Sequence, residues 1–302
     1  MKKKILITGV AGFIGSKLAK RFYEEGYNVF GIDDLSSGKL SNVPKNVNFI
    51  KLDLANKNKL KLIPKECKLI LHLAGQSSGE VSFENPIDDL KRNTFSTLNL
   101  IHQGIENNIQ KIIYASSMSV YGDYKIKLKE NLNLKPLSCY GISKLSSENY
   151  LTAFSKKIPY LIFRMFNVYG PGQDLENLKQ GMLSIYLSQA INKKKIIVKG
   201  SQERKRDFIY IDDVVEIWFR SVQMPKLNNE TFNLGTGVVT SVKDLLDIMK
   251  KYLENFSIIP KESTKGDQNF VCADNNKLIK KFNYKNFVLL KDGLKKFIDS
   301  VR

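Results

Sequence analysis

A tyrosine and a lysine lie four residues apart in the segment Tyr140-Gly-Ile-Ser-Lys144. In a helix, this spacing puts both side chains on the same face. A free tyrosine has a pKa of about 10 and is mostly protonated at neutral pH, so it is a poor base on its own. A neighbouring ammonium group stabilises the phenolate and lowers that pKa. On its own such a pair is more often an exposed ion pair on a helix. Because it follows Ser117, at the end of a predicted strand, by 23 residues in a chain with a dinucleotide-type glycine turn, it predicts a base, Tyr140, tuned by Lys144, that removes a proton from an alcohol.

A glycine-rich stretch, "ILITGVAGFIG", opens the chain and places Gly9, Gly12 and Gly15 in a G-x-x-G-x-x-G spacing. Residues without Cβ can adopt positive φ and let backbone N–H groups approach a pyrophosphate at a helix N-terminus. The stretch therefore predicts a first strand, a phosphate-binding turn and the start of a helix.

An acidic residue, Asp33, ends the next apolar run. A carboxylate at that point accepts hydrogen bonds from the adenosine ribose hydroxyls and repels a 2′-phosphate, which favours NAD over NADP. Asp34 is the competing candidate, with a place in a solvated loop as its alternative.

Short apolar runs alternate with helical patterns over the first half of the chain, as is typical of buried parallel strands joined by crossover helices. The predicted strands cover residues 5–7, 29–32, 47–52, 69–73, 112–115 and 161–166. The predicted helices cover residues 12–25, 86–107 and 140–156. This order indicates an α/β fold with a Rossmann-type, doubly wound parallel sheet.

After about Gly170 the regular alternation ends. Helices are predicted at residues 181–192, 242–253 and 290–300, a short strand at 196–199, and a strand running into a helix across "DFIYIDDVVEIWFRSV". Such a mixed segment fits a smaller C-terminal α/β lobe over the carboxyl ends of the strands.

The basic residues are mostly lysines, spread along the whole chain, and give a formal net charge of +18. Proteins that bind nucleic acid usually concentrate arginine and lysine on one face or tail. The distribution therefore favours a lysine-rich solvated surface without nucleic-acid binding, with attraction of an anionic substrate as a secondary effect.

Cysteine usage and hydropathy bear on the compartment. Cys67, Cys139 and Cys272 are odd in number and lack metal-ligand spacing, which argues against a disulfide framework or a metal site and favours the cytoplasm. No stretch reaches the roughly 18 apolar residues of a membrane span. Thr8 and the glycines also interrupt the opening stretch too often for a signal peptide.

Motifs along nearly the whole chain resemble the extended short-chain dehydrogenase/reductases that act on nucleotide sugars. The matching segments are Thr8-Gly9-x-x-Gly12-Phe13-Ile14-Gly15, Asp33 with "LSSGK", Asp53, "HLAGQ" at 72–76, "ASSMSVYG" at 115–122, the Tyr140–Lys144 segment, "FNVYGPGQ" at 166–173, "RDFIYIDDVV" at 206–215 and "FNLGTG" at 232–237.

This resemblance implies NAD as the cofactor and Ser117 as the hydroxyl that positions the reacting sugar oxygen, beside Tyr140 and Lys144. It also implies that Lys144 reaches the nicotinamide ribose. Asn93 resembles the asparagine that orders the active-site lysine, with an ordinary helix-surface amide as the alternative. The implied cofactor residues are Gly9, Gly12, Phe13, Ile14, Gly15, Asp33, Asp53, Leu54, Leu73, Ala74, Gly75, Asn93, Tyr140 and Lys144.

On the substrate side, the resemblance brings Asn167 and Arg206 to the diphosphate and makes Ser119 a secondary contact. A second arginine of the family precedes an x-G-D sequence, but Thr264 stands there, so Lys265 is expected to supply the charge. Ser77 and Ser78 either touch sugar hydroxyls or cap the following turn. UDP is favoured as the nucleotide, with GDP, CDP and dTDP open.

The residues after Ser117 are Met118 and Ser119, where related 4,6-dehydratases and decarboxylases carry an acid. The predicted reaction is therefore 4-epimerisation of a nucleotide sugar, in which bound NAD takes hydride from C4 and returns it to the opposite face. The alternative is a dehydrogenase or reductase of a nucleotide-linked hexose or heptose, with a non-catalytic NAD-binding regulator as a remoter one.

The expected division is an NAD-binding domain at residues 1–170, joined by some later segments, and a mainly nucleotide-sugar-binding lobe at 171–302. The helices predicted at 86–107 and 140–156 carry wide apolar faces. In the family the equivalent pair builds a homodimer; the alternative is that both faces only cover the sheet.

Overall fold

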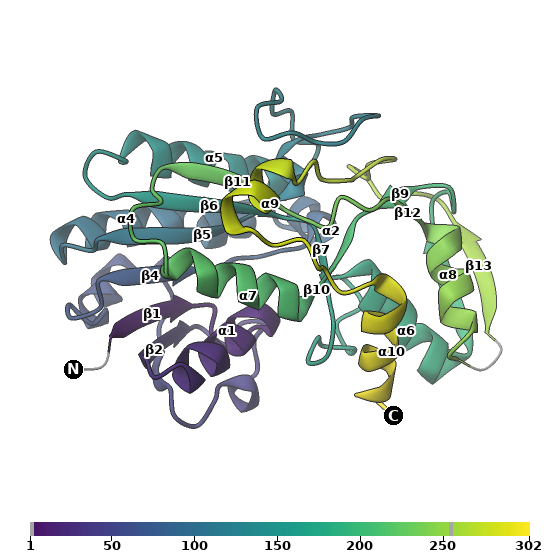
Figure 1. The fold of residues 1–302 in the computed structure, drawn as a ribbon, viewed down its shortest axis with the longest axis horizontal. Coiled ribbons are helices and arrows are strands. Elements are labelled where there is room, and N and C mark those ends of the chain that lie inside the picture. Colours follow the sequence, from purple (N-terminus) through teal and green to yellow (C-terminus); the bar gives the residue numbers. More distant parts are fainter. Residues whose placement is uncertain (1–2, 254–255) are drawn as a thin grey trace.

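The computed structural model describes residues 3–253 and 256–302, and its centre is a seven-stranded parallel sheet in the order β11-β6-β5-β4-β1-β2-β3 (Figure 1). From β1 the chain adds β2 and β3 on one side and then β4, β5 and β6 on the other. In such sheets a crevice forms at the carboxyl ends of the strands where the order reverses, here between β1 and β4. The strands are β1 Lys4–Thr8, β2 Asn28–Asp33, β3 Asn48–Lys51, β4 Leu69–His72, β5 Lys111–Ser117, β6 Tyr160–Met165 and β11 Glu230–Leu234.

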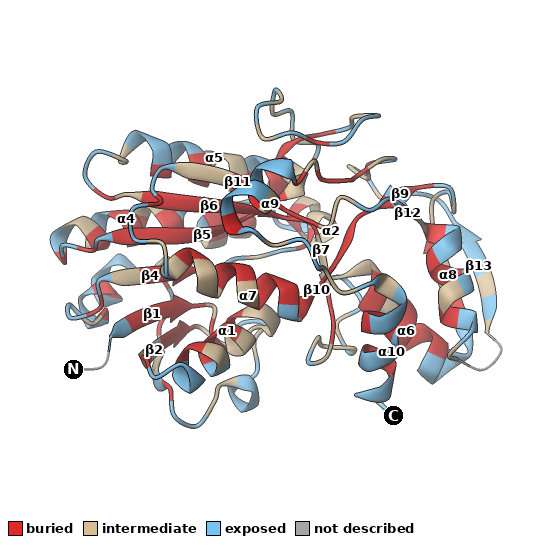
Figure 2. Cartoon of the chain, viewed as in Figure 1, coloured by how far each residue is buried: buried red, intermediate tan, exposed pale blue. Residues whose placement is uncertain are grey.

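Both faces of the sheet are covered, so the residues of its central strands β1, β4, β5 and β6 are mostly buried. Ile5 and Ile7 of β1 join a core with α1 (Phe13–Glu24) and α7 (Ile211–Val222), while Leu6 between them joins a second core on the opposite face. That second core includes residues of α4 (Ser96–Glu106) and α5 (Cys139–Ala153). Figure 2 shows burial concentrated in the strands and in the helix faces turned toward them. The predicted doubly wound sheet is confirmed.

The helix predicted at residues 86–107 is present and contains one π-helical turn. It consists of α3 (Pro86–Leu90), a π-helical turn at Lys91–Phe95 and α4. Within it the Thr97 hydroxyl donates to the Asn93 carbonyl at 2.6 Å. The wider turn changes which residues face inward, and such turns are frequent at functional sites.

The C-terminal elements form a smaller lobe, at the right in Figure 1, and a few segments that rejoin the sheet. The helices predicted at residues 181–192, 242–253 and 290–300 are present with slightly different ends. The strand predicted to run into a helix across "DFIYIDDVVEIWFRSV" is β10 followed by α7. The shorter elements β7, β9, β12, β13 and α9 were not predicted. The bounds are β7 Asn167–Tyr169, α6 Met182–Lys193, β8 Lys195–Lys199, β9 Lys205–Arg206, β10 Phe208–Tyr210, β12 Thr240–Ser241, α8 Val242–Lys250, β13 Ser257–Lys261, α9 Asn276–Phe282 and α10 Leu290–Asp299.

Two kinds of feature are absent from the described residues. None of the helices there combines the length and apolarity needed to cross a membrane. Nor do His, Cys, Asp and Glu side chains of the described part gather in a group of three or more that could hold a metal ion.

Candidate active site

A cleft of about 680 Å³ opens at the carboxyl ends of the strands and is lined by both parts of the chain. Most of the residues singled out from the sequence line it. They are Gly9, Gly12, Phe13, Ile14, Gly15, Asp33, Asp53, Leu54, Leu73, Ala74, Gly75, Ser77, Ser117, Ser119, Tyr140, Lys144 and Asn167. Four others do not: Ser78, Asn93, Arg206 and Lys265.

The glycine turn is built by close approach of backbone to backbone. Gly9 has a φ of +71°, and a Cβ there would lie 2.7 Å from the Ala74 nitrogen. A Cβ on Gly15 would collide with the Gly9 carbonyl oxygen. Gly12 precedes α1 without any side-chain cap, which leaves the first N–H groups of the helix for a ligand. This cradle fits the pyrophosphate of NAD.

The side chain of Asp33 is held against this turn by hydrogen bonds from backbone N–H groups. One carboxylate oxygen accepts a hydrogen bond from the Ala11 N–H at 3.0 Å, and the other accepts one from the Leu35 N–H at 2.8 Å. Burial raises the pKa of Asp33, and the two backbone hydrogen bonds oppose that rise. Because each oxygen has a further lone pair, the carboxylate can still accept from a ribose. Asp34, also at the cleft, instead accepts from the backbone N–H and hydroxyl of Ser36.

Arg92 also lines the cleft, although the sequence analysis did not single it out. It comes from the π-helical turn and pairs with Asp88 at 2.6 Å and with Asp34 at 3.3 Å. Lys39 pairs there with Glu176 at 2.5 Å, joining the loops after β2 and β7. No motif or spacing in the sequence marks Arg92, which the fold brings to the cleft.

The catalytic candidates come from β5 and α5. Ser117 ends β5 and accepts a hydrogen bond from the Ser119 N–H at 3.2 Å. Tyr140 lies in the first turn of α5, and the Lys144 ammonium donates to the Ala115 carbonyl at 2.9 Å. The Lys144 Nζ lies 5.8 Å from the ring centre of Tyr140. The three side chains therefore meet at one end of the cleft.

The pKa values at this end differ from the expectation. Burial raises the pKa of Tyr140 to about 12, against a hydrogen bond with Ser117 that lowers it. Burial also lowers the pKa of Lys144 to about 8, while Asp89 and Glu148 oppose that shift. The predicted lowering of the Tyr140 pKa by Lys144 is therefore wrong for this arrangement. The ammonium bonds to a backbone carbonyl rather than to the phenol, and burial of Tyr140 outweighs the lowering of its pKa by Ser117.

His72 ties the elements around this end together. Its ring nitrogens contact the Thr8 hydroxyl at 2.7 Å and the Thr97 hydroxyl at 2.9 Å, joining β4 to β1 and α4. Burial lowers the pKa of His72 to about 3, so the ring is neutral. His72 has a structural place behind the cleft.

Ser78 and Asn93 lie outside the cleft lining. The Ser78 hydroxyl caps α2 (Gly79–Glu84), accepting from the Val81 N–H at 3.3 Å and donating to the Lys179 carbonyl at 2.7 Å. Of its two expected roles, the structure has the cap. Asn93 is fully buried, so it is not the helix-surface amide weighed as an alternative.

Arg206 and Lys265 also lie away from the cleft lining. Arg206 and Arg204, both buried, bind the two oxygens of the Asp267 carboxylate. The Lys265 ammonium lies 4.7 Å from the ring centre of Phe83 in α2. Arg204 was missed because nothing in its spacing marks it; the structure pairs it with Arg206.

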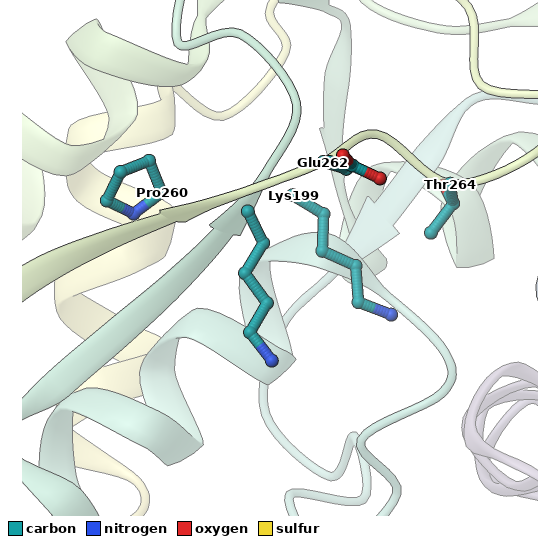
Figure 3. A pocket seen from close by; sticks show the side chains of 5 residues that line it. Lys199, Pro260, Glu262 and Thr264 are labelled. Atoms are coloured by element: carbon teal, nitrogen blue, oxygen red, sulfur yellow. The ribbon is translucent and has the colours of Figure 1, made fainter.

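A second hollow of about 610 Å³ lies on the C-terminal lobe and shares no lining residue with the cleft (Figure 3). The Lys199 ammonium at this hollow pairs with Glu80 of α2 at 2.8 Å. Thr264, which stands where the family resemblance expects a second arginine, lines this hollow and does not line the cleft. The lining residues are Lys199, Pro260, Lys261, Glu262 and Thr264.

Comparison with known proteins agrees with this geometry. The model of the NAD dependent epimerase/dehydratase family matches residues 5–235. A putative UDP-glucose 4-epimerase of Methanocaldococcus jannaschii is 35% identical over 251 residues, 82% of this chain and 81% of that protein. A dTDP-4-dehydro-6-deoxyglucose reductase of Escherichia coli is 30% identical over 100% of this chain and 98% of its own. The UDP-glucose 4-epimerase of Thermotoga maritima, solved with UDP-glucose, superposes with a TM-score of 0.93 at 32% identity, covering 99% and 98% of the two chains.

Proposed function

Because the chain belongs to the NAD dependent epimerase/dehydratase family, we propose that it is a nucleotide-sugar 4-epimerase with NAD as its cofactor. One observation carries the choice of reaction. The cleft brings Ser117, Tyr140 and Lys144 together beside the glycine turn, but Met118 and Ser119 at its edge carry no carboxylate. Elimination of water or loss of CO₂ calls for an additional acid or base there, whereas inversion at one carbinol does not.

The side chains of the catalytic end have distinct tasks in this proposal. The Ser117 hydroxyl positions the sugar oxygen, and the Tyr140 phenol exchanges a proton with it. Because burial disfavours the phenolate, Tyr140 needs positive charge nearby, and the Lys144 ammonium supplies it. Bound NAD supplies the hydride acceptor and donor.

The proposed diphosphate site involves Arg206, in β9, and its partner Arg204. Two guanidinium groups share the single carboxylate of Asp267, so this buried trio keeps one net positive charge. Buried charge is costly without a counterion, and a diphosphate offers bidentate acceptors for arginine. Phe208, two residues beyond Arg206 in the chain, lines the cleft. UDP is the proposed nucleotide, in keeping with the UDP-glucose in the Thermotoga maritima structure.

The test uses purified protein, a panel of nucleotide sugars and no added cofactor, with products separated by chromatography. We expect catalytic inversion at C4 with NAD retained on the protein. The matched control is the free sugar without its nucleotide, which should not react. Stoichiometric reduction of bound NAD followed by arrest would overturn the epimerase assignment.

That second result would favour a dehydrogenase or reductase that exchanges its cofactor at each turnover. The observation in favour of this second candidate is the similarity, over the full chain, to the Escherichia coli dTDP-4-dehydro-6-deoxyglucose reductase. Supplying NADH with 4-keto nucleotide sugars is the direct assay for it.

We further propose that residues 1–170, with α7, β11 and α9, hold NAD and that most of the remaining chain holds the nucleotide sugar. We also propose that the protein is a homodimer. Large apolar side chains are exposed on α3, the π-helical turn and α5, which two-fold packing of helix pairs would cover. They are Ile87, Leu90, Phe95, Ile142 and Tyr150. The three cysteines, all free thiols, support a place in the reducing cytoplasm.

A further inference from the structure

A buried carboxylate lies behind the catalytic end of the cleft, outside its lining. Asp89, in α3, is only 1% exposed. One of its oxygens accepts a hydrogen bond from the Asn93 Nδ2 at 3.0 Å, and the other accepts one from the Ser143 hydroxyl at 2.6 Å. Ser143 directly precedes Lys144, so Asp89 ties α3 to the helix turn that carries the catalytic lysine.

The first bond fixes which end of the Asn93 amide faces the cleft. A carboxylate only accepts hydrogen bonds, so the amide presents Nδ2 to Asp89 and must turn Oδ1 the other way. That Oδ1 is buried and has no hydrogen-bond partner in the described structure. A methyl group built on Gly75 would collide with Oδ1 and lie 3.6 Å from the Lys144 Nζ. The Asn93 carbonyl and the Lys144 ammonium therefore face the same cleft residue.

The charge of Asp89 also acts on Lys144. Of the ionisable groups that influence Lys144, Glu148 of α5 is already paired with Arg164 at 2.7 Å, and His72 of β4 is neutral. The other neighbours are the rings of Tyr114 and Tyr140, which carry no charge at neutral pH. Within the described residues Asp89 forms no ion pair that would cancel its charge. Its carboxylate is thus the main anion holding the buried ammonium in its charged form.

We infer that Asp89 is a positioning residue of the active site, which aims the Asn93 carbonyl at the cleft and serves as the counter-charge of Lys144. The inference rests on the proposed function in treating Lys144 as the cation of the site. Asp89 does not line the cleft, and it acts through Asn93, Ser143 and Lys144.

The test compares Asp89→Asn with Asp89→Glu and Ser143→Ala. The dissociation constant of NAD is measured by calorimetry between pH 6 and 10, and C4 inversion is followed over the same range. In the wild type we expect NAD affinity and turnover to fall as the pH rises through the pKa of Lys144, about 8. In Asp89→Asn this fall should move about one pH unit lower, because the ammonium has lost its counter-charge. Asp89→Glu and Ser143→Ala keep the charge, so the fall should stay at its wild-type pH. Because both variants disturb the hydrogen bonds that Asp89 accepts from Asn93 and Ser143, NAD affinity and turnover should be a few-fold lower at every pH.

Asp213→Asn is the matched control. Asp213 is also 1% exposed and also accepts from one hydroxyl, that of Tyr284, and one N–H, that of Val288. It lies in α7 and does not line the cleft. This variant should lose thermal stability as Asp89→Asn does, with no change in either pH profile.

The outcomes separate the two proposals. If Asp89→Asn binds NAD with the wild-type pH profile, the role of Asp89 is wrong whatever the reaction. If no protein, wild type included, inverts any nucleotide sugar while the NAD profiles shift as expected, the epimerase proposal fails and the role of Asp89 stands. Should Asp89→Asn not fold, unchanged NAD affinity and turnover at every pH in both Asp89→Glu and Ser143→Ala would overturn the inference.

Discussion

At the dinucleotide end of the cleft the turn between β1 and α1 is formed by backbone, whereas at the catalytic end β5 and α5 present buried side chains. The turn at the dinucleotide end requires glycine, since a Cβ on Gly15 would collide with the Gly9 carbonyl oxygen. The catalytic end depends on charged and polar groups kept out of water, which burial shifts away from their ordinary pKa values. One end is therefore sensitive to added volume and the other to changed charge.

The largest effect should come from removing the proton acceptor. Tyr140→Phe takes away one hydroxyl and leaves the glycine turn intact. Turnover should fall by about 10³-fold, the usual size of a positioned acid–base contribution. The dissociation constant of NAD, measured by calorimetry, should stay within about threefold of the wild-type value, because a positioned proton acceptor contributes to the chemical step. A variant that kept most of its turnover would remove Tyr140 from the mechanism.

The next effect belongs to the other end. Gly15→Ala adds a methyl group where no space exists, so we expect NAD affinity to fall by about 100-fold, in line with overpacking costs of a few kcal/mol. Gly26→Ala is the control, because a Cβ there meets nothing within 4 Å, although its φ of +83° still strains an alanine. The control should lose some thermal stability and bind NAD normally. Equal NAD affinity in both variants would contradict the description of the turn.

A third prediction concerns the stability cost of the buried ammonium. The pKa of Lys144 in the folded protein, about 8, lies below its unfolded value of about 10.4, so the charge destabilises the fold at lower pH. Lys144→Met should therefore raise the free energy of unfolding by about 3 kcal/mol at pH 7. The gain should shrink as the pH rises from about 8 toward 10.4, and denaturant titration at several pH values measures it. A variant less stable than the wild type at pH 7 would show that Lys144 is well compensated.

The smallest effect should come from the cleft rim. Lys39 pairs with Glu176 and Asp174 across two loops, but these side chains are largely exposed, and such pairs contribute less than about 1 kcal/mol. Lys39→Ala should speed NAD release only a few-fold in stopped-flow displacement, and high salt should reduce the difference. If the NAD release rate rose by about 100-fold, as much as the NAD affinity of Gly15→Ala is expected to fall, surface charge as well as backbone geometry would determine NAD binding at the dinucleotide end.

Periodic patterns and the residues at strand ends were the features that the sequence predicted best. The glycine spacing and the polar residues that end β2 and β5 were found because parallel strands bring their carboxyl ends to one edge. Tyr140 and Lys144 were singled out from their helical spacing together with the strand-end Ser117 and the glycine turn. These features depend on neighbours in the chain, which a sequence displays directly.

The features that were missed depend on tertiary packing. The π-helical turn at Lys91–Phe95 has no marker in a pattern read at 3.6 residues per turn, and Arg92, which comes from this turn and lines the cleft, was not singled out. Lys265 was assigned by its distance from a motif, but its contact with Phe83 comes from the approach of α2. The pKa of Tyr140 moved the other way because spacing reveals a nearby cation and says nothing of burial.

The place of β11 has a consequence for how the chain is made. Glu230–Leu234 pair with β6, so the edge of that strand stays open until more than three quarters of the polypeptide has left the ribosome. A buried, apolar strand with unpaired backbone groups invites association with other chains. Fragments that stop at residue 170, or at any point before residue 230, should therefore aggregate during expression even though they contain the entire glycine turn.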